Sequence, residues 1–229
     1  MIRLRGIEKT FVNGAIETHV LKGIDLDVAE GEYIALMGAS GTGKSTLMNL
    51  LGCLDRPTGG TYHLDDKDVT DLSDEDLSQV RNEKIGFVFQ QFHLLPRANA
   101  VQNVLLPLVY ARSYPGDAKK RAEGLLAMVG LAERMHYLPG QLSGGQQQRV
   151  AIARALVSEP RLIFADEPTG NLDRESTIEI MDIFRRLHTQ GHTIIMVTHD
   201  PETAANASRI LEMEDGQVVK DEVRGEQQR

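Results

Sequence analysis

The chain has 229 residues, 41% of them hydrophobic, which is enough for one domain with a buried core, and its net charge of −8 argues against a dedicated nucleic-acid surface. A single cysteine, Cys53, excludes an intrachain disulfide and a cysteine zinc cluster. No apolar run approaches the roughly 20 residues of a transmembrane helix, and the start is charged rather than signal-like, so we expect a cytoplasmic protein.

The first glycine-rich motif, GASGTGKST, matches the pattern G-x-x-x-x-G-K-[ST]. It lies between residues 33–37, an apolar run that predicts a strand, and residues 46–54, whose pattern predicts a helix. Backbone N–H groups of such a loop surround phosphate oxygens at the helix N-terminus. The motif therefore predicts a nucleoside triphosphate site, in which Lys44 neutralises the phosphates and Ser45 binds Mg²⁺ through its hydroxyl. The predicted nucleotide contacts are Gly38, Ala39, Ser40, Gly41, Thr42, Gly43, Lys44, Ser45 and Thr46.

Three later apolar runs end in polar residues of catalytic type. They are residues 85–89 with Gln90, residues 162–165 with Asp166 and Glu167, and residues 193–198 with His199. Helical patterns separate the runs, which predicts an α/β fold with a mainly parallel sheet. Ligands of such sheets bind outside the carboxyl ends of the strands, so we expect these side chains at the same edge as the phosphate loop.

Nucleotide hydrolysis needs an acidic residue that holds Mg²⁺ and a group that orients or deprotonates the attacking water. Asp166 is predicted for the first role and Glu167 for the second. His199 is predicted to contact the γ-phosphate, and Gln90 to act as a weak Mg²⁺ or water ligand. Each residue also has a simpler interpretation as a polar or capped strand end, and beside a phosphate loop we favour the functional one.

A second glycine-rich motif, LSGGQQQR, precedes a helical pattern over residues 146–157. Free amides at this helix N-terminus and the Ser143 hydroxyl predict a second anion site, but simple N-capping by Ser143 explains the same residues. The residues alone do not separate these interpretations. Asp173 and Asp117 also precede helical patterns, the latter over residues 118–129, and N-capping explains both.

Together these motifs resemble the ATP-binding cassette (ABC) ATPases. GASGTGKST, Gln90, LSGGQ, LIFADE and His199 occur in the order and spacing of that family, and the resemblance covers practically the whole chain. In that family the LSGGQ element of one subunit closes over the γ-phosphate held by the other, so two ATP molecules are enclosed in a head-to-tail homodimer. The resemblance therefore implies ATP hydrolysis with Mg²⁺, and it gives the second anion site a role.

The resemblance also assigns roles by position. Phe11 matches the aromatic residue that stacks on adenine, which needs only a ring face, and Asp173 matches the D-loop residue at the subunit contact. The implied signature contacts are Ser143, Gly144, Gly145 and Gln146. The Q-loop, the Walker B aspartate, the catalytic glutamate and the switch histidine correspond to Gln90, Asp166, Glu167 and His199.

The implied fold is a P-loop NTPase (RecA-like) core with a mainly parallel sheet, an antiparallel β subdomain and an α-helical subdomain. The antiparallel sheet is expected from residues 1–30 and 60–70. The whole chain, 1–229, would be one ABC ATPase domain, with the core and β subdomain at about 1–90 and 161–229 and the helical subdomain at about 91–160.

Transporters of this family couple the ATPase to a membrane permease. The resemblance thus implies a peripheral subunit at the cytoplasmic face of the inner membrane, held there by its permease. Two hydrophobic segments, Phe92–Leu95 and Asn103–Tyr110, are candidates to line the permease groove, with subdomain core as the alternative.

Finer similarity points to the macrolide-efflux and lipoprotein-releasing ATPases. LKGIDLDV, GCLDRPTGGTY, GFVFQQFHLLP and ADEPTGNLD look most like that group, and GCLD, GGTY and GHTIIMVTHDP favour the macrolide-efflux type. The alternative is a signalling ATPase whose membrane partner regulates cell-wall hydrolases and moves no substrate. DNA-repair and translation ATPases of the same fold carry long coiled coils or two tandem cassettes, and this sequence has neither pattern.

Overall fold

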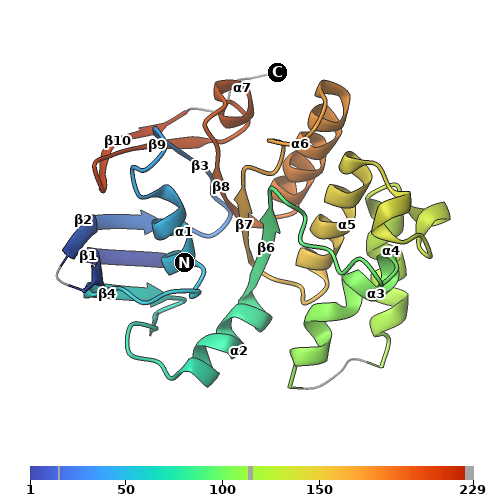
Figure 1. Cartoon of the computed structure of the whole chain (residues 1–229), viewed down its shortest axis with the longest axis horizontal. Helices are drawn as coiled ribbons and strands as arrows, with labels where there is room; N and C mark the ends of the chain where they lie inside the picture. The colour runs from blue at the N-terminus through green and yellow to red at the C-terminus, as the bar shows by residue number, and fades with distance from the viewer. Residues whose placement is uncertain (15, 113–115, 225–229) are drawn as a thin grey trace. The chain divides into compact units, whose positions relative to one another are not determined.

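The structure is a computed structural model that describes residues 1–14, 16–112 and 116–224, so the last residues of the predicted domain, 225–229, lie outside it. The chain forms two compact units (Figure 1). The first contains residues 1–78 and the chain from residue 193 onward, and the second contains residues 79–192. The chain passes from one unit to the other within helix α2 (Asp74–Lys84). The predicted subdomain limits near residues 90 and 160 remain a prediction.

An antiparallel sheet forms one part of the first unit. Its strands are β1 (Ile2–Asn13), β2 (Ile16–Val28), β4 (Gly59–Leu64) and β5 (Lys67–Asp68). They lie in the order β2-β1-β4-β5, and all three pairings are antiparallel. Figure 1 shows β2, β1 and β4 side by side. Along β1 the apolar Ile2, Leu4 and Ile7 are fully buried while Arg3 and Arg5 are exposed, as expected for a sheet with one face on a core. The antiparallel sheet predicted for residues 1–30 and 60–70 is confirmed.

Parallel strands form the other part of the first unit. The elements are β3 (Tyr33–Met37), α1 (Lys44–Leu51), β8 (Thr193–Val197), α7 (Pro201–Ala204), β9 (Arg209–Glu214) and β10 (Gln217–Val223). Strand β3 pairs in parallel with both β8 and β9, and β10 is antiparallel to β9. Every residue of β8 is buried, and α1 and α7 contact the parallel strands. A near-continuous apolar run is what a strand in the interior of a parallel sheet requires.

The second unit combines two parallel strands with most of the helices. Its elements beyond α2 are β6 (Ile85–Phe89), α3 (Ala100–Leu105), η1 (Leu106–Tyr110), α4 (Ala118–Met128), η2 (Ala132–Arg134), η3 (Pro139–Gln141), α5 (Gly144–Leu156), β7 (Leu162–Asp166) and α6 (Arg174–Thr189). Helix α5 contacts β6, α3, α4 and α6, and it is therefore central to this unit (Figure 1). It approaches β6 closely because Gly86 has no side chain, and a Cβ there would lie 2.5 Å from the Ala155 carbonyl oxygen.

Two predicted helix ends differ from the structure. Helix α1 covers residues 44–51 rather than 46–54, because Gly43 at φ 100° lets the helix begin at Lys44 and Cys53, at φ 54°, lies beyond its end. Asp117 precedes α4 as predicted, but its side chain makes no capping hydrogen bond, so that capping prediction was wrong. Its φ and ψ of −101° and 10° differ from the extended conformation that directs an N-cap side chain toward the helix amides.

Among the residues that the structure describes, none of the helices has the length and hydropathy needed to span a lipid bilayer.

Candidate functional site

The first glycine motif forms a tight loop between β3 and α1. Gly38, Gly41 and Gly43 have positive φ values of 148°, 84° and 100°, which side chains with a Cβ rarely adopt. A Cβ on Gly38 would also lie 2.4 Å from the Met213 carbonyl oxygen. Because α1 starts with no side-chain capping bond, its first amides remain available to an anion. The loop thus has the geometry of a phosphate cradle.

Lys44 lies folded over this loop. Its ammonium group donates to the Gly38 and Ala39 carbonyl oxygens, both at 2.7 Å, and the residue is largely buried. Two of the three ammonium N–H groups are therefore used to hold the charge at the loop. Ser45, one residue later, is exposed at the helix N-terminus, where its hydroxyl can reach a bound ligand.

His199 lies at the same edge of the first unit as the phosphate loop. Strands β3 and β8 are in register, with Leu36 opposite Val197, so both strands end at one level. The Thr198 amide still donates to the Leu36 carbonyl at 3.2 Å, and His199 follows in an exposed position. Asp200 then caps α7, and its hydrogen bond with the Thr203 hydroxyl holds the pKa of that carboxyl below its ordinary value.

Phe11 lies in the same unit and is linked to the loop through β2. It is 45% exposed and stands opposite Thr18 in the β1–β2 register. Two residues further along β2, the Val20 carbonyl oxygen would lie 3.1 Å from a Cβ on Gly43. The Lys9 ammonium is 4.9 Å from the centre of the Phe11 ring. An exposed ring this close to the phosphate loop fits adenine stacking.

The second unit brings together Gln90, Asp166 and Glu167. Phe89 at the end of β6 is opposite Asp166 at the end of β7, so Gln90 and Glu167 follow at neighbouring positions. Asn171, which the sequence analysis did not single out, exchanges two hydrogen bonds with Gln90. Its amide donates to the Gln90 backbone oxygen at 3.2 Å, and the Gln90 amide donates to its side-chain oxygen at 3.3 Å.

Glu167 has an unusual backbone conformation. Its φ is +43°, in the left-handed region that non-glycine residues seldom occupy and that costs conformational energy. Its carbonyl accepts from the Gly170 amide at 3.0 Å, which closes a turn directly after β7. Surrounding contacts must hold this conformation, and such strain in ordered structure is typical of functional positions.

Ser143 and Gln146 form a reciprocal capping box at the start of α5. The Ser143 hydroxyl accepts from the Gln146 amide at 3.3 Å, and the Gln146 side chain accepts from the Ser143 amide at 3.1 Å. N-capping by Ser143 is therefore present. The same turn packs closely on α6, since a Cβ on Gly145 would lie 2.6 Å from the Ser176 hydroxyl oxygen.

Asp173 caps α6 beside this turn, as predicted. Its carboxylate accepts from the Ser176 amide and the Ser176 hydroxyl, both at 2.9 Å. The bond from the Ser176 amide is the largest cause that lowers the pKa of the Asp173 carboxyl from its ordinary value. Ser176 therefore connects the Asp173 cap with Gly145, so the two predicted contact elements are adjacent within one unit.

Comparison with known proteins identifies the family. The family described as "ABC transporter" matches residues 21–170. The chain belongs to the ABC transporter family. The match includes the phosphate loop, the turn formed by Ser143 and Gln146, and the Asp166–Glu167 pair of this ABC ATPase.

Curated relatives of this ABC ATPase include separate and fused proteins. The ABC transporter ATP-binding protein YknY of Bacillus subtilis (strain 168), described as uncharacterized, is 53% identical over 96% of this chain and 95% of its own length. The macrolide export ATP-binding/permease protein MacB of Azoarcus sp. (strain BH72) is 54% identical over 96% of this chain. The chain spans only 34% of that MacB protein.

Solved structures agree with the fold and the activity. The cassette MJ0796, in a dimeric post-hydrolysis state bound to ADP and Pi, has a TM-score of 0.90 and 44% identity over 98% of this chain and all of its own. CbiO1 from Clostridium perfringens, part of an ABC transporter complex, has a TM-score of 0.84 and 32% identity over 96% of this chain and 87% of its own. The chain is thus a P-loop ATPase that binds and hydrolyses ATP, with Mg²⁺ as the usual metal.

The donors present fit a magnesium ion that is shared with the nucleotide. Among the described residues, no three His, Cys, Asp or Glu side chains gather into a metal site. Mg²⁺ prefers oxygen ligands and commonly completes its shell with phosphate oxygens and water. The predicted ligands Ser45, Gln90 and Asp166 supply a hydroxyl, an amide oxygen and a carboxylate, all of the required type.

Gln148 and Arg154 are further α5 residues that the sequence analysis missed. Gln148 is fully buried and bonds to the last residue of β6 and to the loop after β7. Arg154 donates to the Phe92 and His93 carbonyls at 2.8 and 2.6 Å. Burial lowers the pKa of the Arg154 guanidinium from its ordinary value. Helical spacing from Gly145 to Ile152 would have placed Gln148 on the buried face, but three glutamines in a row conceal that signal.

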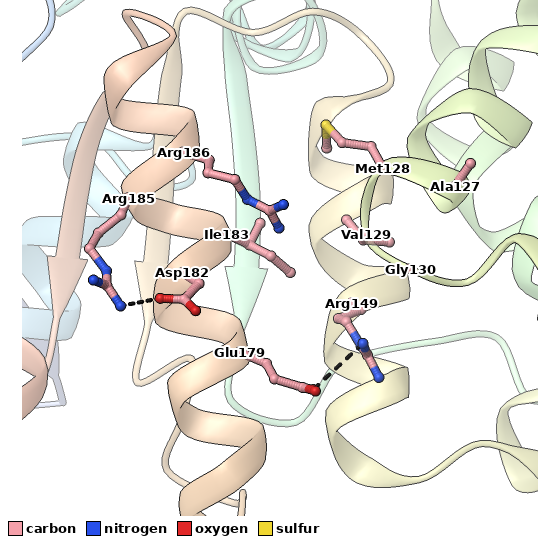
Figure 2. A pocket seen from close by; sticks show the side chains of 10 residues that line it. All are labelled: Ala127, Met128, Val129, Gly130, Arg149, Glu179, Asp182, Ile183, Arg185 and Arg186. Atoms are coloured by element: carbon pink, nitrogen blue, oxygen red, sulfur yellow. Dashed lines mark hydrogen bonds and ion pairs between the residues drawn. The ribbon is translucent and has the colours of Figure 1, made fainter.

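A cavity of about 530 Å³ in the second unit involves none of the predicted site residues. Figure 2 shows Arg149 of α5 directed toward Glu179 of α6, and their ion pair of 3.5 Å lies at this cavity. Arg185 bonds to Asp182 on α6 itself. The charged lining therefore joins α5 to α6 and does not resemble the phosphate cradle.

Proposed function

We propose that this chain is the ATP-binding subunit of a macrolide-efflux-type ABC transporter and drives a membrane permease. The observation that carries the proposal is the 54% identity to a MacB export protein across 96% of the chain. Lipoproteins are the second candidate class of substrate within the same group, and the sequence motifs favour them less than macrolides.

The proposed reaction begins with ATP at the first glycine motif. Amides of the loop and of α1 bind the phosphate oxygens, Lys44 offsets their charge and Phe11 stacks on the adenine. Mg²⁺, when bound, polarises the phosphate oxygens. Glu167 accepts a proton from the water that attacks the γ-phosphorus, while His199 and Gln90 orient that water. The bond between the γ-phosphorus and the β–γ bridging oxygen breaks, so that ADP and inorganic phosphate leave.

The proposed active form is a homodimer. The amides of Gly144 and Gly145 and the side chains of Ser143 and Gln146 of one copy would bind the γ-phosphate held by the other copy. Asp173, adjacent to this turn through Ser176, would lie at the subunit contact. Support comes from the dimeric state of the MJ0796 cassette, which is 44% identical to this chain.

The proposed permease surface lies on the second unit. Leu95, Val109 and Tyr110 are 45%, 65% and 76% exposed, and a cavity of about 540 Å³ is lined by Leu95, Pro96, Arg97, Ala98 and Gln102. Within the second predicted segment, 103–110, the residues Asn103, Val104 and Leu108 are buried. That segment thus has an inner side in the core and, with Leu95, an apolar outer side that suits a helix of the permease.

Deletion of the gene, followed by complementation, tests the proposed function. We expect the deletion strain to become more sensitive to a macrolide such as erythromycin, the wild-type gene to restore resistance, and Glu167→Gln to fail. Exposed Lys67→Ala is the matched control and should restore resistance. Unchanged macrolide sensitivity with lipoproteins retained in the inner membrane would move the assignment to lipoprotein release. Unchanged sensitivity with a cell-separation defect would favour the signalling alternative, which the relatives named for ABC transport and export do not support.

A further inference from the structure

Gln148 connects three segments of the second unit. It lies on α5 with no exposed surface, and its side-chain amide donates to the Pro168 carbonyl at 2.6 Å and to the Phe89 carbonyl at 3.4 Å. Pro168 directly follows Glu167, and Phe89 directly precedes Gln90. A single side chain therefore holds the backbone next to both predicted catalytic residues.

The orientation of the Gln148 amide is determined by its partners. Two carbonyl oxygens face the NH₂ group, and the reverse orientation would direct the amide oxygen at them. In the observed orientation the side-chain oxygen is buried and accepts no hydrogen bond from any described residue. An unpaired buried carbonyl lowers stability, so a methionine or leucine of similar size would remove this cost while it also removed the donor to Pro168, and the two effects on stability oppose each other.

The left-handed backbone of Glu167 is the feature that the hydrogen bond from the Gln148 amide can help to hold. Because Glu167 has a left-handed backbone, the turn after β7 needs external restraint, and the short bond to Pro168 acts one residue away. Arg154 binds the same helix to Phe92 and His93, which also have left-handed backbones. Of these two α5 side chains, Gln148 is the one that bonds both to the end of β6 and to the loop after β7.

We infer that Gln148 is a positioning residue for ATP hydrolysis. Its side chain links helix α5 to the segments that carry Gln90 and Glu167. When a phosphate engages the N-terminus of α5, a displacement of the helix is carried to both loops through this amide. The inference rests on the catalytic roles proposed above for Gln90 and Glu167, and it does not depend on the transported substrate.

Steady-state ATP hydrolysis by Gln148→Met is the test. Methionine keeps the volume and removes the donor, so we expect kcat to fall about ten- to a hundredfold, the cost of a small displacement of catalytic groups. The KM for ATP should stay near the wild-type value, because the phosphate loop is untouched. The Tm should change little, because the donor lost to the Pro168 carbonyl is offset by removal of the unpaired side-chain oxygen of Gln148. Gln79→Met is the matched control, since the Gln79 amide donates to Glu83 within α2, away from the predicted site residues, and the variant should keep wild-type kcat.

Either wild-type kcat in Gln148→Met, or a kcat that falls only in step with a lowered Tm, would overturn the inference in favour of simple packing. Gln148→Leu is measured in parallel, so that the test survives if one substitution alone prevents folding. Glu167→Gln in the same assay separates the two proposals. Full turnover there would reject the catalytic assignment itself, whereas loss of turnover there with full activity in Gln148→Met would reject only the role of Gln148.

Discussion

Lys44 holds its charge over the phosphate loop through hydrogen bonds to the loop itself. Its two bonds to loop carbonyls hold the ammonium in place, so little side-chain freedom is lost when a nucleotide binds. The lysine is thus pre-organised toward phosphate oxygens, and its removal should affect binding more than folding.

Lys44→Ala should weaken ATP binding. Loss of one charge-assisted contact corresponds to an increase in Kd of roughly tenfold to a hundredfold. Isothermal titration with ATP and Mg²⁺ measures the change, and exposed Lys67→Ala is the control that keeps the wild-type Kd. An unchanged Kd for Lys44→Ala would contradict the phosphate-loop assignment.

At the residue scale the motifs correctly predicted those features that the local sequence determines. GASGTGKST predicted a strand, a loop and a helix, and the structure has them, because glycine and apolar runs act locally. The left-handed backbone of Glu167 and the burial of Gln148 were not predictable, since both depend on contacts between α5 and loops far away in the chain. Both features arise from tertiary contacts, and no local sequence pattern indicates them.

At the scale of elements, Arg209 holds the β9–β10 hairpin to its neighbours. On β9 it forms a bidentate pair with Asp221 of β10 at 2.6 and 2.7 Å, and it also bonds to Glu32 at 2.9 Å. The hydrogen bond from Arg209 is the largest cause that lowers the pKa of the Asp221 carboxyl. Because β10 has no buried residue, this ion pair is an important contact between β10 and β9.

The stabilisation by Asp221 should depend on pH. Because its pKa is lower in the folded state than in the unfolded state, the ionised carboxylate stabilises the fold above the unfolded pKa, and this contribution is lost as the pH falls through the folded pKa. Asp221→Asn should lower the Tm at neutral pH, and the difference from wild type should shrink below about pH 4. Calorimetry across this range measures it, with exposed Asp71→Asn as the control. A Tm difference that stays constant with pH would argue against the ion pair.

At the scale of whole elements the sequence was a good guide to type and a poorer one to ends. All four predicted parallel strands are present, because continuous apolar runs bounded by polar residues have few other solutions in an α/β fold. Asp117 makes no capping bond because its own backbone, at φ −101° and ψ 10°, is not in the extended conformation of an N-cap, and composition does not specify that conformation.

At the scale of the whole molecule, a variant that binds ATP without hydrolysing it should show whether two copies form a dimer. Glu167→Gln should still bind ATP but not hydrolyse it, so the nucleotide-bound dimer accumulates. Gel filtration should show a shift from monomer to dimer when ATP and Mg²⁺ are added, and no shift in the Lys44→Ala, Glu167→Gln double variant. A monomer at saturating ATP would speak against the head-to-tail arrangement.

The two glycine motifs differ in how their helices begin, and this difference suggests an order of events. Helix α1 has no side-chain cap, so its first amides can donate to phosphate without losing a bond within the chain. At the start of α5 the Gln146 amide already donates to Ser143, so a phosphate at this turn competes with that bond. In the proposed dimer, the uncapped α1 would therefore take up ATP first, and the capped α5 would bind the γ-phosphate later, when a second copy presents it.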